Sequence, residues 1–245
     1  MSNSLIIDCL RGADAYWQDS NPCALVVSGS PVGAGVSLLS RLAEVADFIL
    51  AVDSGADALF EAGLMPDLLL GDFDSIQQST LDFFRDSGVE LEIHDAYKDA
   101  TDIELAIDRL LELGYSSIIA TNVLGGRIDH ELASLGCFAQ AAQRGAAVAI
   151  VEAHEECLFL SSESERRRLT IATPIAATIP FFSLIPWGGN AIVSISGTEW
   201  ELDHARLTPF GTLGVSNVPK EDQISVEVHE GVVIAVVENR SEICR

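Results

Sequence analysis

The chain has 245 residues, 48% of them hydrophobic, so it can bury a substantial core and is not intrinsically disordered. Its 37 acidic residues against 14 Lys and Arg give a formal charge of −23, and a surface this acidic repels nucleic acids and anionic membranes, which both require clustered cations on a partner. Residues 1–20 lack the pattern of a secretion signal, and no apolar run is long enough to span a bilayer, so we expect a cytoplasmic protein.

Short apolar runs alternate with amphipathic stretches between residues 23 and 151. The runs predict strands at Cys23–Val27, Phe48–Val52, Leu68–Leu70, Val89–Ile93, Ser117–Thr121 and Ala147–Val151. The stretches between them predict helices near 35–46, 55–62, 76–86, 102–113 and 130–143. This alternation indicates an α/β domain over residues 21–155, in which a parallel sheet would bind a nucleotide.

The helix near 102–113 has the most clearly marked ends. Thr101 and Glu104 have the spacing of a capping box at its start. Gly114 suits the position just after its last turn, where glycine readily adopts the left-handed conformation. The sequence therefore predicts a helix that begins after Thr101 and stops before Gly114.

The character of the sequence changes after about residue 155. A polar break at 161–165 is followed by short β-rich runs separated by glycine and proline. We expect strands at Thr178–Leu184, Ala191–Ile195, Ile224–Val228 and Val232–Val237, the last two joined by a turn near His229–Gly231. These runs predict a smaller all-β sandwich domain over residues 165–245. Residues 1–20 form an N-terminal extension to which the sequence assigns no role.

Four polar segments each follow a predicted strand of the first domain. They are Asp53–Asp57, Gly71–Ser75, Lys98–Asp102 and Gly125–His130. In a parallel sheet the carboxyl ends of the strands lie along one edge, where open α/β folds bind their ligands. So many carboxylates at one edge repel each other unless a cation lies among them. The sequence therefore predicts a divalent metal ion there.

Mg²⁺ suits this edge, because it takes a few carboxylates together with water and phosphate oxygens. We predict Asp72, Asp74 and Asp102 as its ligands, since residues at i and i+2 of an extended segment point the same way. Lys98 and Arg127 would then face phosphate oxygens, Lys98 as a point charge and Arg127 through its planar fork.

Each segment also has a purely structural explanation. Ser75 could be the N-cap of the next helix, Thr101 and Asp102 could only cap a helix, and Gly125–Gly126 could be a tight turn. The glycine-rich loop 29–35 lacks the Gly-Lys-Ser/Thr of a Walker loop. It is equally compatible with a plain loop and with one whose N–H groups approach a nucleotide. Convergence on one sheet edge favours a ligand site.

Six segments, in this order and spacing, resemble the thiamine pyrophosphokinase family. The similar segments are Asp53–Asp57, Pro66–Ser75, Lys98–Asp102, Gly125–His130, Gly197–Trp200 and Gly214–Asn217. The resemblance implies an α/β domain followed by a β-sandwich, and a homodimer with its active sites at the subunit interface. It also implies transfer of pyrophosphate from Mg-ATP to the thiamine hydroxyl, with AMP as the other product.

The resemblance also implies roles for single residues. Asp72, Asp74 and Asp102 match the magnesium-binding carboxylates, with Asp129 beside them, and Arg127 matches a residue near the nucleotide phosphates. Together with Lys98 these form the expected catalytic set. The positions assigned to ATP are Asp53, Ser75, Thr101 and Arg127, and those assigned to thiamine are Trp200, Ser216 and Asn217. The chain departs from the family at Ser54, where many relatives carry Gly, and at Val218, where bacterial members often carry Glu.

The thiamine assignments also make chemical sense on their own. An indole face offers stacking to a flat aminopyrimidine and cation–π attraction to a thiazolium ring, so Trp200 suits this substrate. Ser216 and Asn217 can supply directional hydrogen bonds to a ring edge. The structural alternative for Trp200 is a half-buried residue of the sandwich.

Three other functions are compatible with the same residues. A related pyrophosphokinase could act on a hydroxymethyl pterin. A metal-dependent phosphoesterase could use the same carboxylates to activate water. The chain could also be a non-catalytic, nucleotide-binding dimer whose acidic edge is only solvated.

Overall fold

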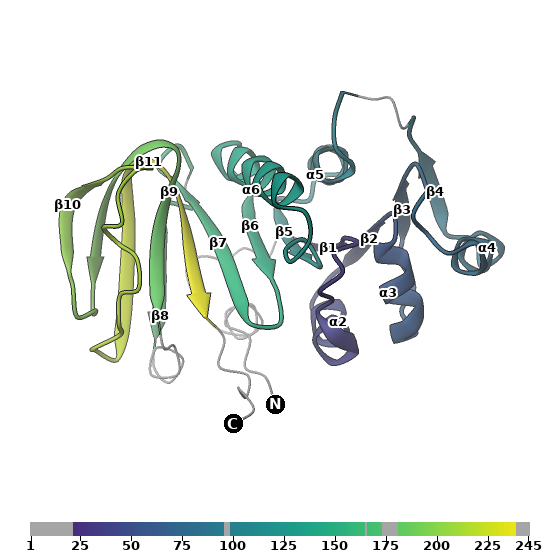
Figure 1. Cartoon of the computed structure of the whole chain (residues 1–245), viewed down its shortest axis with the longest axis horizontal. Coiled ribbons are helices and arrows are strands. Elements are labelled where there is room, and N and C mark those ends of the chain that lie inside the picture. Colours follow the sequence, from purple (N-terminus) through teal and green to yellow (C-terminus); the bar gives the residue numbers. More distant parts are fainter. Residues whose placement is uncertain (1–21, 96–98, 165, 173–180, 239–245) are drawn as a thin grey trace. The chain divides into compact units, whose positions relative to one another are not determined.

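The computed structural model describes residues 22–95, 99–164, 166–172 and 181–238 (Figure 1). The N-terminal extension expected at residues 1–20 lies outside them. The described chain forms two compact units. The α/β unit comprises residues up to Cys137 together with Ile150–Ala153, and the β unit comprises Phe138–Ala149 and the residues from His154 onward.

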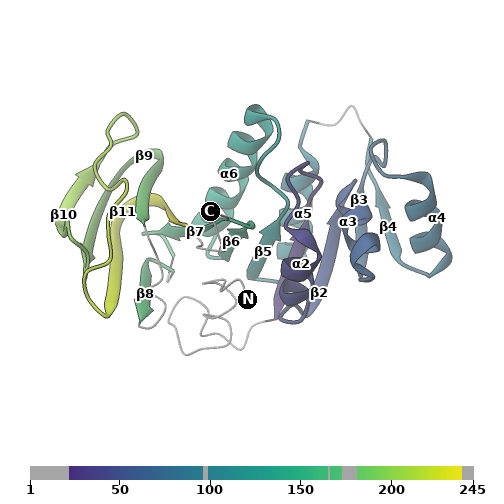
Figure 2. The same ribbon diagram turned by 60° about the horizontal axis from the view of Figure 1, so that its bottom comes forward.

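The α/β unit is built on a parallel sheet. Its strands are β1 (Cys23–Val27), β2 (Phe48–Val52), β3 (Leu68–Gly71), β4 (Glu90–Ile93) and β5 (Ser117–Thr121). They run in the order β5-β1-β2-β3-β4, and each neighbouring pair is parallel (Figure 2). All residues of β1 and β5 are buried, as expected for strands that have neighbours on both sides and helices on their faces. The predicted strands and their parallel pairing are confirmed.

Helices connect the successive strands of this unit. They are α2 (Gly35–Ala43), α3 (Gly55–Ala62), α4 (Gln78–Asp86) and α5 (Asp102–Glu112). The helices α2 and α3 lie on one side of the sheet and α5 on the other (Figure 1). After β5 the chain forms α6 (Ile128–Gln143) and β6 (Ala147–Val151), and the boundary between the two units falls within these elements.

Helix α5 begins and ends as the sequence predicted. The Thr101 hydroxyl accepts a hydrogen bond from the Glu104 N–H at 3.3 Å, which satisfies one of the free donors of the first turn. The chain leaves the helix at Gly114 with a φ of 91°. Helix α4, by contrast, has Gln77 as its N-cap, so the alternative that Ser75 caps this helix is wrong.

The β unit contains antiparallel strands. These are β7 (Glu155–Ser161), β8 (Arg168–Ala172), β9 (Phe182–Ser196), β10 (Leu202–Leu207) and β11 (Gln223–Glu238). On one side of β11 its first half pairs with β8 and its second half with β7, while β9 pairs with both halves on the other side. The β-rich character of this part of the chain is confirmed.

The long strands differ from the shorter ones that the sequence predicted. Ala191–Ile195 lies inside β9, and Ile224–Val228 and Val232–Val237 lie inside β11. The turn predicted near His229–Gly231 is wrong, because β11 continues through these residues with a shift in its pairing to β9. Of the predicted strand at Thr178–Leu184, residues 178–180 lie outside the described residues and β9 begins at Phe182.

No helix in the described part of the chain is long and apolar enough to cross a membrane. Helix α5, for example, has one polar face and one buried face. The buried face is formed by Ile103, Ala106, Ile107 and Leu110. This spacing is that of an amphipathic helix that packs on a sheet.

Cys23, the first residue of β1, leads to a prediction on pH. Its side chain is 5% exposed, and burial, aided by the nearby Asp47 carboxylate, raises the pKa of the thiol from 9.0 to about 12. Because the fold favours the protonated thiol, the raised pKa of Cys23 contributes to the free energy of unfolding. This contribution is complete below pH 9 and is lost as the pH rises toward about 12. We expect the free energy of unfolding in urea to fall over this range, and to fall less steeply in a Cys23→Ala variant. An equal slope in both proteins would contradict the assignment.

Candidate active site

A cavity of about 410 Å³ lies in the α/β unit, where the loops that follow the strands meet. The loops after β1, β2, β3 and β5 and the start of α5 all contribute to its wall. Because these strands are parallel, their carboxyl ends lie at one edge of the sheet. The cavity therefore lies at the edge of the sheet where the sequence predicted a ligand site.

Five of the predicted residues line this cavity. They are Asp53, Ser75, Thr101, Asp102 and Arg127. They come from four polar segments that are far apart in the sequence, and the topology of the sheet brings these segments together. Such a concave site with several converging polar side chains is typical of a ligand-binding pocket.

Asp53 links the loops that follow β2 and β3. It has a φ of 45°, and its Oδ1 accepts a hydrogen bond from the Phe73 N–H at 3.2 Å. A Cβ atom at Gly71 would lie 1.8 Å from the same oxygen, so only glycine allows the carboxylate to approach the end of β3 this closely. The pair fixes Asp53 at the edge of the cavity.

Asp72 and Asp74 lie in a turn that follows β3. Phe73 between them has a φ of 63°, and the Asp74 N–H donates to Asp72 Oδ1 at 3.1 Å. The expectation that these residues form an extended segment is therefore wrong, because the chain turns as soon as β3 ends. Among the described residues, Asp53 and Ser75 line the cavity, whereas Asp72 and Asp74 do not.

The donor atoms at this edge suit a hard divalent cation. Carboxylate oxygens from Asp72, Asp74 and Asp102 are the ligand type that Mg²⁺ prefers. In the described part of the chain, however, no group of three His, Cys, Asp or Glu side chains is gathered closely enough to hold a metal ion. The residues fit an ion that is bound by one or two carboxylates and whose coordination shell is completed by water and phosphate oxygens. They do not fit an ion bound by the protein alone.

Arg127 and Asp129 form a paired fork at the start of α6. The Arg127 Nε donates to Asp129 Oδ1 at 3.1 Å and Nη2 donates to Oδ2 at 2.6 Å. The hydrogen bond from the guanidinium lowers the pKa of the Asp129 carboxyl. Both side chains are exposed, so the pair is weak and Arg127 can exchange its partner for a phosphate. Lys98, the other predicted cation, lies outside the described residues.

Two glutamates that support the cavity wall were missed in the sequence. Glu131 Oε1 accepts hydrogen bonds from the N–H groups of Gly125 at 2.9 Å and Gly126 at 2.7 Å. Glu152 is only 8% exposed and accepts hydrogen bonds from the N–H groups of residues 122–124. No motif marks Glu152, and the one available signal is a charged residue directly after the wholly apolar strand β6.

The predicted thiamine residues come together in the β unit. Asn217 is 3% exposed, and its side chain is bonded to the backbone of Trp200, with Oδ1 accepting from the N–H at 3.1 Å and Nδ2 donating to the carbonyl at 2.7 Å. The Trp200 side chain is 60% exposed. Ser216 beside Asn217 has a φ of 57° and is exposed. Asn217 thus fixes the backbone that presents the indole to solvent.

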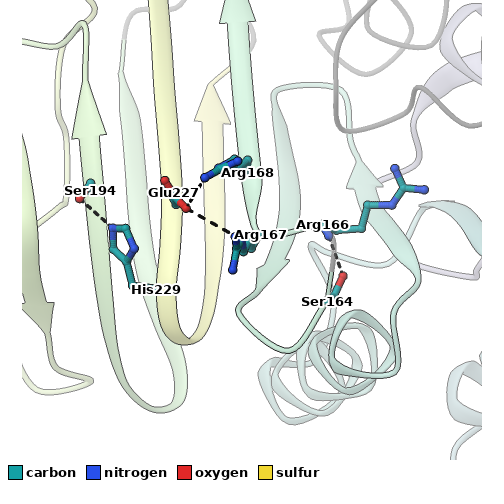
Figure 3. A network of polar contacts seen from close by, with 7 residues as sticks. All are labelled: Ser164, Arg166, Arg167, Arg168, Ser194, Glu227 and His229. Carbon is teal, nitrogen blue, oxygen red and sulfur yellow. Dashed lines mark hydrogen bonds and ion pairs between the residues drawn. The ribbon is translucent and has the colours of Figure 1, made fainter.

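A second cavity, of about 550 Å³, lies in the β unit on the faces of β8, β9, β10 and β11. Figure 3 shows the polar contacts around it, with Glu227 paired to Arg168 at 2.8 Å and to Arg167 at 3.9 Å, and Ser194 bonded to His229. The hydrogen bond from Arg168 lowers the pKa of the Glu227 carboxyl. These groups bond to one another, as is typical of a solvated sheet face.

Two protein-family models match successive parts of the chain. The model of the thiamin pyrophosphokinase catalytic domain matches residues 39–150, and that of the thiamin pyrophosphokinase vitamin B1 binding domain matches residues 168–233. The chain is 33% identical over 172 residues to thiamine pyrophosphokinase 1 of Arabidopsis thaliana, a match that covers 66% of this chain and 61% of that protein. The chain thus spans about three fifths of the length of this relative.

Bacterial relatives are matched over more of their length. Thiamine pyrophosphokinase of Bacillus subtilis is 24% identical over 194 residues, which cover 76% of this chain and 85% of that protein. The crystal structure of thiamine pyrophosphokinase from Bacillus subtilis has a TM-score of 0.75 to this chain at 22% identity, and covers 88% of this chain and 98% of its own. At this identity the likeness concerns the fold.

Proposed function

The chain belongs to the thiamine pyrophosphokinase family, and we propose that it transfers a pyrophosphoryl group from Mg-ATP to the hydroxyl of thiamine, with release of AMP. The observation that carries the proposal is the cavity of the α/β unit, which five residues expected to act on ATP line together. The catalytic-domain model matches the same part of the chain, and the β unit supplies an exposed indole suited to thiamine.

The nucleotide would bind at the carboxyl edge of the parallel sheet. Arg127 would leave Asp129 and bind phosphate oxygens through its fork, because charge-assisted bonds to phosphate are stronger than an exposed ion pair. Asp53, Ser75 and Thr101 line the same cavity and would hold the rest of the nucleotide. Lys98 would add a second cation near the phosphates.

The reaction is an in-line displacement at the β-phosphorus of ATP. The thiamine oxygen forms a bond to this phosphorus, the bond from phosphorus to the oxygen that bridges the α- and β-phosphates breaks, and AMP leaves with that oxygen. We assign the proton of the hydroxyl to Asp102, a carboxylate that lines the cavity. Mg²⁺, bound to the phosphates and to one or two of the carboxylates of Asp72, Asp74 and Asp102, would offset the charge that develops on the phosphate oxygens.

Thiamine would stack on the indole of Trp200, with Ser216 bonded to a ring edge. We assign Asn217 to the same site, where its amide holds the Trp200 backbone. The proposal includes a homodimer whose active sites lie where two subunits meet. It is tested by comparing the molar mass from light scattering with the 26.2 kDa of one chain.

The reaction itself is tested by measuring AMP release with ATP, Mg²⁺ and thiamine present, and with each left out in turn. We expect AMP and thiamine diphosphate only in the complete mixture. Thiamine-independent consumption of ATP would identify a phosphoesterase, and product formed only from a hydroxymethyl pterin would identify the related pyrophosphokinase. No turnover together with no binding of Mg-ATP by calorimetry would overturn the proposal.

A further inference from the structure

Glu152 is a buried carboxylate that the proposed reaction does not use. It follows β6 directly and is 8% exposed. Its Oε1 accepts hydrogen bonds from the N–H groups of Val123 at 2.7 Å and Leu124 at 3.1 Å, and its Oε2 accepts one from the Asn122 N–H at 3.1 Å. A buried charge is costly unless it is well paired. Three donors on one carboxylate meet this requirement and fix the loop that follows β5.

Asn122 transmits this arrangement to a second loop. It has a φ of 58°, a left-handed conformation that Asn adopts more readily than most residues with a side chain, and it is 3% exposed. Its carbonyl accepts a hydrogen bond from the Ser30 N–H at 2.8 Å, and its side-chain oxygen accepts one from the Ala34 N–H at 2.6 Å. The Ser30 hydroxyl donates in turn to the carbonyl of Leu124. The loop after β1 is therefore bonded to the loop after β5.

These two loops form one wall of the cavity in the α/β unit. Residues 28–31 line it from the first loop, and Val123 and Gly126 line it from the second. Among the lining residues that the structure describes, Glu152 is absent, so it supports the wall from behind. Its own position is fixed, because the buried Thr121 hydroxyl donates to the carbonyl of Val151 at 2.7 Å.

The carboxylate of Glu131 accepts hydrogen bonds from the next two amides of the loop after β5. The N–H groups of residues 122–126 therefore all donate hydrogen bonds to a carboxylate, either that of Glu152 or that of Glu131. Glu131 itself lines the cavity, whereas Glu152 lies behind it. Only Glu152 can therefore be changed without altering a group that a ligand in the cavity would touch.

We propose that Glu152 is a positioning residue for the nucleotide site, which it holds ready for Mg-ATP by fixing the loops after β1 and β5 in one arrangement. The proposal rests on the function proposed above. Hydrogen bonds to a charged acceptor are about twice as strong as neutral ones, so a carboxylate orders these amides better than any neutral group of the same shape. Pre-ordered loops lose less conformational freedom when a ligand binds, and this strengthens binding.

The test is Glu152→Gln in the full chain, because Gln has nearly the same volume but presents an NH₂ group to donors that need acceptors. We expect the Kd of Mg-ATP, measured by calorimetry without thiamine, to rise by about 10-fold to 100-fold, the loss typical when a group that orients the ligands of a metal ion is removed. The KM for ATP should rise similarly and the KM for thiamine should stay near its original value. Amide hydrogen exchange at residues 122–124 should become faster.

Asp47→Asn is the matched control. Its carboxylate also accepts a hydrogen bond from a backbone N–H of this sheet, that of Cys23 at 2.8 Å, but at the opposite, amino end of the strands. We expect this variant to lose some stability and to keep its Kd for Mg-ATP. If Glu152→Gln does not fold, Glu152→Asp keeps the charge at shorter reach and should show the same direction of change in Kd.

Two failures can be told apart. If the original protein binds Mg-ATP and the folded Glu152 variants bind it equally well, the role of Glu152 is overturned and the proposed function stands. If both variants of Glu152 and Asp47→Asn weaken binding to the same degree, the effect is general loss of stability and the inference is also overturned. If the original protein neither binds Mg-ATP nor releases AMP, the proposed function has failed. Faster amide exchange at residues 122–124 in Glu152→Gln would then still show that Glu152 orders this loop.

Discussion

Replacing Asp102 by Asn should lower the rate of AMP release by about 100-fold to 1000-fold, the loss typical when one charged or polar group that stabilises a transition state is removed. Asp102 lines the cavity at the first position of α5, and the proposed reaction needs its charge both near the metal and as a proton acceptor. The fold should survive. Its charge at the start of a helix contributes only about 0.3–1 kcal/mol, and the cap at Thr101 remains.

The control for this experiment is Asp108→Asn, which makes the same change farther along α5, at a residue that is not among those lining the cavity in the described chain. It should leave turnover near its original value.

Asp72→Asn and Asp74→Asn test the other two proposed metal ligands. These residues lie in the turn after β3 and not in the wall of the cavity. Losses as large as that of Asp102→Asn would support a shared metal ion. Near-normal activity in all three variants would refute the metal assignment.

The α/β unit could be predicted closely because most of its strands are short apolar runs, with polar residues or turns between them. Cys23–Val27 and Ser117–Thr121 are buried along their whole length, and polar residues stop the apolar run at each end. Burial and hydrogen bonding therefore end where the sequence pattern ends. The parallel pairing of these strands then places the polar segments at one edge, which is why convergence of Asp53, Asp102 and Arg127 followed from the sequence.

The β unit was less predictable because parts of its strands lack the sequence pattern of a strand. β10 (Leu202–Leu207) is mostly exposed and carries Asp203, His204 and Arg206, so its sequence lacks the alternation of a half-buried strand. His229–Gly231 has the composition of a turn, but pairing with β9 carries the strand through it, and Gly231 is accommodated with a φ of 80°. For β11 the partner β9 lies far away in the sequence, whereas β10 pairs with β9 directly before it although its own residues give no strand pattern.

The support of the cavity wall was beyond the sequence for the same reason. Glu152 is separated by about 30 residues from the amides that it bonds, and its partners are backbone groups, which leave no trace in residue types. The turn after β3 was misjudged for a different reason. The left-handed conformation of Phe73 is rare for an aromatic residue, and local preference argues against it.

Replacing Trp200 by Ala should raise the KM for thiamine by about 30-fold, which corresponds to the ~2 kcal/mol of a cation–π contact shielded from water. The indole is 60% exposed, so its removal leaves no cavity in the core and should change the stability little. Trp200→Phe keeps an aromatic face and should recover most of the affinity. The measurement is the KM for thiamine at saturating Mg-ATP, together with the KM for ATP, which should not change.

Two further variants decide whether the indole acts by itself. Phe210→Ala removes an aromatic ring of the β unit that is even more exposed than Trp200, and it should leave the KM for thiamine unchanged. Asn217→Ala keeps the indole but removes both side-chain bonds that hold the Trp200 backbone, so it should raise the same KM by a smaller factor. If Trp200→Ala and Phe210→Ala have equal effects, exposed aromatic surface in general is responsible, and Trp200 is not the residue on which thiamine stacks.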